Sequence, residues 1–280
     1  MVGRIRYGTS SWSEKAWAGV FYPRGLPAGE QLAHYAERFD TVEADVTYYR
    51  VPDERLVRGW ARKTPAGFTL SAKFPRTVVH AGEGAQPDGE RVLDLAHCAR
   101  DVERFLSSMA LLGDRCGPLV LQFPYFNKRA FARPEDFLER LGRFLESLPR
   151  DFRYGVELRN KSWVDAPLYE LLRAQRTALV LVDLAYLPHP AELFERGDPL
   201  TTDFAYARLI GDRKQIDALT DTLDRVVLDQ GERLERWARL LVTLRERVPE
   251  TYVYANNHYA GFAPDTIEDL AARVAGRASC

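Results

Sequence analysis

Cysteine is scarce in this chain of 280 residues, which has only Cys98, Cys116 and Cys280. None of the three forms a CxxC pair, and an odd number cannot all pair within one chain. This usage is typical of a protein in a reducing compartment rather than of a disulfide-stabilised secreted domain. We therefore predict a cytoplasmic protein.

Long apolar runs are also missing. No window approaches the roughly 18 apolar residues that a membrane-spanning helix needs, and the first residues, Met-Val-Gly-Arg-Ile-Arg-Tyr, contain no apolar signal-peptide region. The sequence therefore predicts neither secretion nor a membrane span.

Neither sign of charge is in excess, because 39 basic residues face 40 acidic ones. This balance removes a bulk electrostatic attraction to nucleic acid or to an acidic membrane. Only a local basic stripe could bind nucleic acid, and we favour a solvated helix face for the candidate residues. These are Arg50, Arg58, Arg62, Lys63 and Arg76.

The common cofactor motifs are absent as well. The chain lacks the HxH, HExxH and CxxC spacings of metal sites, and the segment 8–13 lacks the GxGxxG of dinucleotide-binding folds. We predict no nucleotide cofactor and assign no metal ligands. Binding of a divalent ion stays an open alternative, because Glu43, Glu157, Asp183 and His80 carry suitable donor atoms.

What the chain does have is a regular alternation of short β-rich runs and segments of helical period. The expected strands are residues 5–9, 41–49, 68–74, 117–123, 152–159, 178–184, 204–209 and 251–256. The expected helices are residues 29–39, 53–63, 91–112, 134–148, 168–175, 217–248 and 265–274.

This alternation predicts a parallel sheet, because parallel neighbours need a crossover that a helix supplies. Eight units make a (β/α)8 TIM barrel the leading fold, as a single domain over residues 1–280, with a doubly wound open sheet as the alternative. The segment 185–203 contains Pro188, Pro190, Gly197 and Pro199. We therefore expect the helix between strands six and seven to be shortened or replaced by a loop.

Polar side chains occur near the C-terminal ends of seven of these strands. Side chains two residues apart share a face of a strand, so their position predicts that they point into the barrel. They would meet at the C-terminal mouth, where TIM barrels carry their active sites. The alternative is an ion-pair layer in which the charges satisfy one another. The residues are Glu43, Lys73, Gln122, Glu157, Asp183, Arg208 and Asn256.

Chemical roles follow from these residue types. We predict Glu157 as the principal acid or base and Glu43 as its partner, with Lys73 and Arg208 as an electrostatic clamp and Asp183 completing the catalytic set. Further side chains after the strands could bind the ligand through amides, cations or ring stacking, although the aromatic ones could equally be packing residues. These are Trp12, Tyr22, Tyr49, His80, Gln122, Arg159, Trp163, Asn256 and Asn257.

Several short motifs occur together in a specific order. They are Gly8-Thr9-Ser10-Ser11-Trp12, Phe21-Tyr22-Pro23, Val42-Glu43, Thr47-Tyr48-Tyr49-Arg50-Val51-Pro52, Lys73-Phe74-Pro75-Arg76, Gly117-Pro118-Leu119-Val120-Leu121-Gln122-Phe123-Pro124, Val156-Glu157-Leu158-Arg159, Ser162-Trp163, Tyr206-Ala207-Arg208 and Asn256-Asn257. Over nearly its full length the chain resembles the DUF72, or YecE-like, family. The resemblance implies a TIM barrel but no activity, since the family is uncharacterised.

Some positions depart from the pattern of that family. Ser11, Asp45 and Tyr48 stand where glycine, asparagine and phenylalanine are common, and Ile210 stands where a histidine often follows the arginine of strand seven. The last departure puts in doubt any mechanism that needs a base on that strand.

We therefore predict an enzyme that acts on a small anionic molecule, phosphorylated or acidic and sugar-like, by hydrolysis, elimination or isomerisation. Two alternatives stay open. One is a nucleic-acid processing enzyme, by analogy with barrel endonucleases. The other is a barrel that binds a ligand without chemistry.

Overall fold

The computed structural model describes residues 2–278, so Cys280 lies outside the described residues. Eight parallel strands form one sheet in the order β1-β8-β7-β6-β5-β4-β3-β2. Their bounds are β1 Arg4–Thr9, β2 Thr41–Ala44, β3 Thr69–Lys73, β4 Cys116–Gln122, β5 Tyr154–Glu157, β6 Ala178–Leu184, β7 Phe204–Gly211 and β8 Glu250–Ala255.

The two edge strands, β1 and β2, lie against each other and nearly close the barrel. Gly8 makes this approach possible, because a Cβ atom at its position would lie 2.1 Å from the Thr41 carbonyl oxygen. Asp40, directly before β2, accepts a hydrogen bond from the Tyr7 backbone N–H at 3.1 Å and forms an ion pair with Arg4 at 2.8 Å. The seam is therefore held by a close backbone contact and a shared carboxylate.

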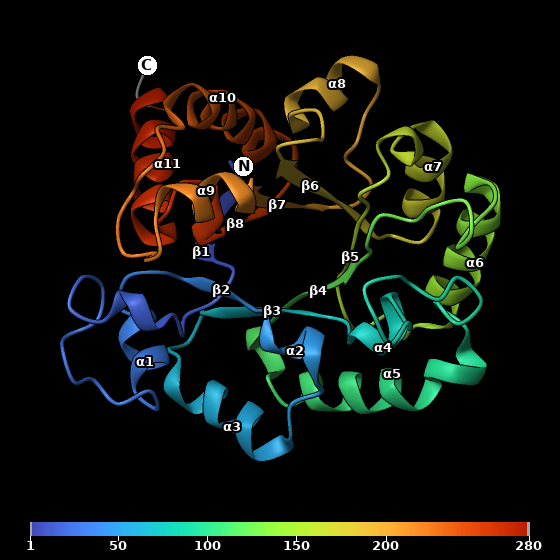
Figure 1. Cartoon of the computed structure of the whole chain (residues 1–280), viewed down its shortest axis with the longest axis horizontal. Coiled ribbons are helices and arrows are strands. Elements are labelled where there is room, and N and C mark those ends of the chain that lie inside the picture. The colour runs from blue at the N-terminus through green and yellow to red at the C-terminus, as the bar shows by residue number, and fades with distance from the viewer. Residues whose placement is uncertain (1, 279–280) are drawn as a thin grey trace.

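Helices surround the strands in a ring (Figure 1). The α-helices are α1 Gln31–Tyr35, α2 Val46–Tyr49, α3 Glu54–Lys63, α4 Arg76–Val79, α5 Leu95–Ala110, α6 Pro134–Ser147, α7 Ala166–Ala174, α8 Leu193–Arg196, α9 Arg213–Leu219, α10 Gly231–Arg247 and α11 Ala263–Ala278. Short 3-10 turns are η1 Lys15–Trp17, η2 Gly113–Arg115, η3 Lys161–Trp163, η4 Pro190–Glu192 and η5 Asn257–Tyr259. The predicted (β/α)8 TIM barrel is confirmed.

Local chemistry sets several of these boundaries. Asp53 caps α3 by accepting a hydrogen bond from the Leu56 N–H at 2.8 Å, and Pro134 occupies the first turn of α6. Between strands six and seven the chain makes only η4 and the four-residue helix α8, so the expectation of a shortened helix is confirmed.

Several predicted elements were wrong in length. The helix expected over residues 29–39 is only α1, Gln31–Tyr35, and the strand expected over 152–159 is only β5, Tyr154–Glu157. The strand expected over residues 41–49 ends at Ala44, because Asp45 adopts helical backbone angles and begins α2. The single helix expected over 217–248 is two helices, α9 and α10. Thr220 is extended and ends α9, and Asp229 accepts a hydrogen bond from the Gly231 N–H at 2.8 Å at the start of α10.

The barrel interior is a second core, distinct from the layer between strands and helices. Its members come from alternate positions of β4, β6, β7 and β8, as the two-residue period of a strand requires. They are Val120, Ala178, Val180, Val182, Leu184, Phe204, Tyr206, Tyr252 and Tyr254. None of the helices within residues 2–278 combines the length and apolar character needed to cross a bilayer.

Candidate active site at the barrel mouth

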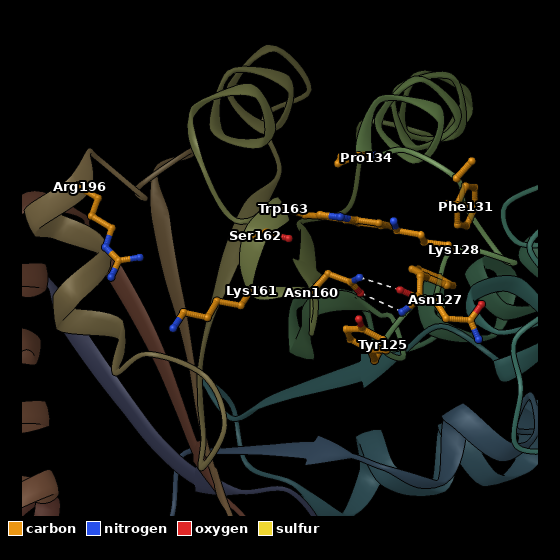
Figure 2. A pocket seen from close by; sticks show the side chains of 12 residues that line it. Tyr125, Asn127, Lys128, Phe131, Pro134, Asn160, Lys161, Ser162, Trp163 and Arg196 are labelled. Carbon is orange, nitrogen blue, oxygen red and sulfur yellow. Dashed lines mark hydrogen bonds between the residues drawn. The ribbon is translucent and has the colours of Figure 1, made fainter.

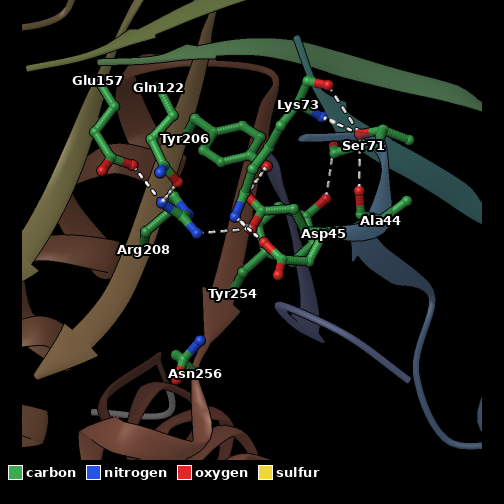
Figure 3. Close-up of polar contacts among 12 residues, drawn as sticks. Ala44, Asp45, Ser71, Lys73, Gln122, Glu157, Tyr206, Arg208, Tyr254 and Asn256 are labelled. Atoms are coloured by element: carbon green, nitrogen blue, oxygen red, sulfur yellow. Dashed lines mark hydrogen bonds and ion pairs between the residues drawn. The ribbon is translucent and has the colours of Figure 1, made fainter. Parts of the chain in front are cut away.

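Arg208 is the centre of a buried charged cluster at the C-terminal end of the barrel. It follows Phe204 and Tyr206 on the inward face of β7, and it is 2% exposed. Its Nη2 donates to Glu43 Oε1 at 2.8 Å, and its Nη1 donates to Gln122 Oε1 at 2.7 Å and pairs with Glu157. One guanidinium therefore joins β2, β4, β5 and β7 (Figure 3).

Glu43 has partners on both of its oxygens. The Tyr206 hydroxyl donates to Oε2 at 2.7 Å, while Oε1 accepts from Arg208 and lies 3.3 Å from Lys73 Nζ. Lys73 also pairs with Asp45. The carboxylate of Glu43 is thus completely enclosed by protein donors, with no exposed surface.

Glu157 is held less completely. Its Oε2 pairs with Arg208, but Oε1 has only the Arg159 guanidinium, whose Nε and Nη2 both lie at 3.4 Å. Glu157 has no exposed surface, whereas the Arg159 side chain is 28% exposed. The partly exposed guanidinium of Arg159 therefore covers one oxygen of a buried carboxylate.

The cluster holds Glu43 in its ionised form. Burial alone would raise the pKa of this carboxyl, but the charges of Arg208 and Lys73 and the hydrogen bond from Tyr206 outweigh burial and lower the pKa below its ordinary value of 4.5. Burial and the neighbouring Glu43 charge raise the pKa of the Tyr206 phenol well above its ordinary value. Tyr206 is therefore a neutral donor at neutral pH.

The lowered pKa of Glu43 has a consequence for stability that can be measured. The unfolded chain takes up a proton at this position near 4.5 and the folded chain only at lower pH, so the stabilisation is complete above 4.5 and is lost on acidification below it. We expect Glu43→Gln to lower the free energy of unfolding by about 1–3 kcal/mol at neutral pH. The deficit relative to the unsubstituted chain shrinks as the pH falls below 4.5.

Urea unfolding at a series of pH values measures this deficit. Glu139→Gln, on an exposed side chain of α6, is the control and is expected to give no pH-dependent difference beyond a few tenths of a kcal/mol. A Glu43→Gln deficit that stays constant down to acid unfolding would contradict the ionised, charge-stabilised state of Glu43.

Two tyrosines and two arginines rim the mouth above the cluster. The charges of Arg76 and Arg159 act on the Tyr48 phenol, and the charges of Arg159 and Glu157 act on that of Tyr186. Burial nevertheless raises the pKa of both phenols, so both keep their protons at neutral pH. The rim therefore offers hydroxyl donors beside guanidinium groups.

A cavity of about 210 Å³ lies beside the cluster at the β1 and β8 side of the mouth. Asp45 lines it, together with Asn256 and Asn257 after β8. Asp45 pairs with Lys73, so the cavity and the charged cluster share a wall. Two of the predicted ligand-binding amides therefore lie at the mouth, although Asn256 is apart from Arg208 (Figure 3).

Asp183 was predicted to point into the barrel, and this was wrong. It pairs with Arg233 and accepts hydrogen bonds from Trp237 Nε1 at 2.9 Å and the Tyr259 hydroxyl at 3.0 Å, all outside the sheet. Its neighbours Val182 and Leu184 take the inward positions of β6. Because β6 is apolar on both faces, its composition gave no sign of which face carried Asp183.

Three aromatic residues predicted to bind ligand differ in their surroundings. Tyr22 is buried, and its hydroxyl donates to the Trp12 carbonyl. Trp12 packs edge-on against Trp60 of α3, with ring centroids 5.5 Å apart. Tyr49 is 74% exposed at the end of α2, and its one ring contact is an edge-on approach to Tyr48. The rings of Tyr22 and Trp12 therefore serve loop packing, which was the alternative for each, whereas ligand binding by the exposed Tyr49 stays a prediction.

The side chain of His80 also makes its hydrogen bonds within its own loop. Its Nδ1 accepts from the Gly82 N–H at 3.2 Å, its Nε2 lies 3.4 Å from the Ala85 carbonyl oxygen, and the residue is buried. Burial and the nearby Arg76 lower the pKa of the imidazole, so it is neutral at neutral pH. His80 therefore orders the loop after β3 and does not join the carboxylates.

Trp163 lies in a separate pocket of about 600 Å³ formed by the loops after β4 and β5. It stacks on Phe126, with ring centroids 6.1 Å apart. Figure 2 shows Trp163 and Tyr125 on opposite sides of Asn160, with Lys161 and Arg196 further along the wall. Trp163 therefore lines a different pocket from the one beside the charged cluster, and its role in ligand binding stays a prediction.

The site also contains residues that the sequence analysis did not assign to it. Tyr206 and Asp45 contact the charged groups, and Tyr48 and Tyr186 lie near enough to Arg159 to be influenced by its charge. Tyr206 could have been found, because it is two residues before Arg208 on the same strand. Tyr186 follows β6 in an irregular segment, where no periodicity indicates a direction.

Metal binding gains no support from the geometry. Within residues 2–278 no three His, Cys, Asp or Glu side chains come together as ligands. Asp183 lies on the other side of the sheet from Glu43 and Glu157, which removes the four-residue set that had left a divalent ion open.

These features define an α/β barrel protein with a buried, charge-balanced cluster beneath a polar mouth. Residues 6–279 match the family model described as "Protein of unknown function DUF72". The chain belongs to the DUF72 family, as its motifs had indicated. That family has no assigned function.

The names of the curated relatives likewise state no function. The chain is 33% identical over 156 residues to the UPF0759 protein YecE of Escherichia coli K12, a match covering 56% of this chain and 48% of the relative. It is 24% identical over 166 residues to the UPF0759 protein YunF of Bacillus subtilis, covering 59% and 54%. The matched part is thus about half the length of these relatives.

Solved structures match over nearly the whole chain. A DUF72 family protein from Thermotoga maritima is similar with a TM-score of 0.69 and 29% identity, covering 97% of this chain and 99% of the other. A DUF72 family protein from Enterococcus faecalis has the same TM-score with 19% identity, covering 97% and 96%. The second likeness concerns the fold alone.

Proposed function

We propose that this protein is an enzyme that binds a small anionic molecule at the barrel mouth and uses Glu157 to move a proton. The observation that carries the proposal is the unequal state of the two buried carboxylates. Glu43 has strong partners on both oxygens, whereas Glu157 has one oxygen covered only by Arg159 at 3.4 Å. Two carboxylates in different surroundings can divide their roles.

Arg159 links anion binding to this chemistry. Its guanidinium is partly exposed, and its fork of donors suits a carboxylate or a phosphate. An anion that draws Arg159 toward the mouth uncovers Glu157 Oε1. The substrate thereby creates the vacant oxygen that takes up or delivers the proton, and Arg208 keeps the carboxylate in place through Oε2.

The other residues of the site hold the catalytic groups in place or contact the substrate. Glu43 and Lys73 fix Arg208 and Asp45 and are positioning residues rather than proton carriers. Arg76 adds a second cation at the rim, and the phenols of Tyr48 and Tyr186 supply donors for oxygens of the substrate. Two cations at one rim favour a substrate that carries a phosphate or carboxylate group.

The test is a turnover screen of pooled sugar phosphates and uronates with the full chain. We expect Glu157→Gln to reduce kcat by about 100- to 10,000-fold, the usual contribution of a general acid or base. Arg159→Gln is expected to raise KM, because the anion loses its guanidinium. Glu170→Gln, on the exposed face of α7, is the control. Unchanged turnover in Glu157→Gln would remove the assigned role.

One observation favours a second candidate, a barrel that binds its ligand without chemistry. Glu43, Glu157, Lys73 and Arg208 neutralise one another within the protein. Retention of an anion that is never converted, with binding lost in Arg159→Gln, would support this candidate over the enzyme. Salt-sensitive binding of a DNA or RNA fragment would instead favour a nucleic-acid partner.

A further inference from the structure

The pocket of about 600 Å³ formed by the loops after β4 and β5 has a fixed, apolar floor (Figure 2). Asn160 ties the two loops together, because its Oδ1 accepts from the Phe126 N–H at 2.9 Å and its Nδ2 donates to the Phe126 carbonyl at 2.8 Å. Trp163 packs on Phe126 and on Phe137, with ring centroids 6.1 Å and 5.4 Å away. A ligand therefore does not have to order these loops in order to bind.

One aromatic side chain of this pocket is left free. Tyr125 is 62% exposed, and its side chain forms no ring pair and no hydrogen bond with another described residue. An exposed ring beside an apolar floor offers a surface on which a planar group can stack.

Three cations line the same pocket, and none of them has a carboxylate partner among residues 2–278. They are Lys128 after β4, Lys161 after β5 and Arg196 at the end of α8. The nearby Arg133, which does not line the pocket, pairs with Asp136 at 2.8 Å. No aspartate or glutamate of the described chain belongs to the wall. A pocket lined by one sign of charge attracts a ligand of the opposite sign.

The polar and aromatic groups of the wall follow an order. Figure 2 shows Lys161 and Arg196 toward one end of the pocket. The Ser162 hydroxyl lies nearer to Trp163, and Tyr125 lies in the same part of the pocket as Trp163. Two cations, a hydroxyl group and a free ring match the order of phosphate, ribose and base in a nucleotide. The volume also falls in the range of roughly 300–1,000 Å³ that is typical of small-molecule sites, and a bare phosphate would fill little of it.

We propose that this pocket binds a nucleoside monophosphate, with its phosphate between Lys161 and Arg196, its ribose at Ser162 and its base on Tyr125. The site is distinct from the anion site at Arg159 and goes beyond the proposed function. A phosphate monoester suits the two cations better than a carboxylate, because it carries about −1.5 to −2 charges at neutral pH and has three acceptor oxygens. No glycine-rich turn is required, since side chains from separate loops hold the phosphate.

Calorimetric titration of the full chain compares four ligands. AMP contains a base, a ribose and a phosphate. Adenosine lacks the phosphate, ribose 5-phosphate lacks the base, and phenyl phosphate has a ring and a phosphate but no ribose. We expect AMP to bind about tenfold or more tightly than each of the other three, because each of them loses one set of contacts.

Two substitutions of exposed side chains separate the contacts. Tyr125→Ala is expected to weaken the binding of AMP and adenosine about tenfold, as for one lost base-stacking contact, and to leave ribose 5-phosphate binding unchanged. Arg196→Gln is expected to weaken the binding of AMP and ribose 5-phosphate about tenfold and to leave adenosine binding unchanged. Tyr125→Phe keeps the ring, and Arg133→Gln removes a cation outside the pocket, so both controls are expected to bind AMP as the original chain does. Thermal unfolding followed by circular dichroism checks that all four variants are folded.

The variant Arg159→Gln separates this inference from the proposed function. We expect it to bind AMP as tightly as the original chain, whatever its effect on turnover at the mouth. AMP binding that is lost in Arg159→Gln but kept in Tyr125→Ala and Arg196→Gln would place the nucleotide at the mouth and overturn the inference, while the proposed function would stand. Phenyl phosphate binding as tight as that of AMP, or no measurable AMP binding, would also overturn it.

Discussion

Replacing Arg208 with methionine is expected to lower the free energy of unfolding by about 3–5 kcal/mol, the usual effect of removing one partner from a buried ion pair. Arg208 contacts Glu43, Glu157 and Gln122 and is 2% exposed. Without it, two carboxylates stay inside the barrel with too few cations. Urea unfolding followed by circular dichroism measures the loss.

Removing the buried negative charges distinguishes an electrostatic cause of the lost stability from a loss of side-chain packing. We expect Glu43→Gln and Glu157→Gln, added to Arg208→Met, to restore most of the stability, since the buried negative charges are then gone. The exposed ion pair of Arg213 and Asp217 gives the control: Arg213→Met is expected to change stability by less than about 1 kcal/mol. A triple variant no more stable than Arg208→Met would contradict the electrostatic explanation.

Replacing Asp183 with alanine is expected to lower the free energy of unfolding by about 3 kcal/mol, because three donors lose their common acceptor. Trp237 Nε1 and the Tyr259 hydroxyl are buried with it, whereas the Arg233 side chain is 35% exposed and can turn to solvent. Asp183→Asn keeps one acceptor oxygen, and we expect about half of this loss. Thermal and urea unfolding measure both variants.

This substitution also tests where Asp183 acts. An Asp183 outside the barrel stabilises the contact between β6 and α10, so Asp183→Asn is expected to leave ligand affinity at the mouth unchanged. A loss of anion binding without a loss of stability would contradict that location. Asp269→Ala, which breaks a half-exposed pair with Arg273, is the surface control and is expected to have an effect below about 1 kcal/mol.

The fold could be predicted because the signals for it are local. Eight apolar runs separated by helical segments repeat along the chain, and Pro134 and Asp53 mark helix starts through their own backbone chemistry. The prolines and the glycine in the segment after β6 likewise predicted that its helix would be short. The single helix predicted over 217–248 failed because Thr220 is extended and ends α9, and the Asp229 carboxylate accepts a hydrogen bond from the Gly231 N–H at the start of α10. These two ends interrupt an otherwise helical pattern.

The site could be predicted in part, for a related reason. On β2, β3 and β7, polar residues alternate with apolar ones, so Glu43, Lys73 and Arg208 could be placed inside the barrel from their own strands. On β6 both faces are apolar, and the single polar residue, Asp183, could lie on either side. Tyr22 failed for another reason: a position just past a strand end does not say whether a ring faces a ligand or a neighbouring loop.

The sequence by itself determined the eight-stranded barrel, the alternation that turns Glu43 and Arg208 inward, and the family. These properties depend on residues close together in the chain. Only the tertiary structure decided that Arg208 lies between Glu43 and Glu157, that Asp183 binds Trp237 outside the sheet, and that Asp45 and Asn256 line one cavity. Each of those contacts joins segments far apart in sequence, and their geometry follows from closure of the barrel and the packing of its loops.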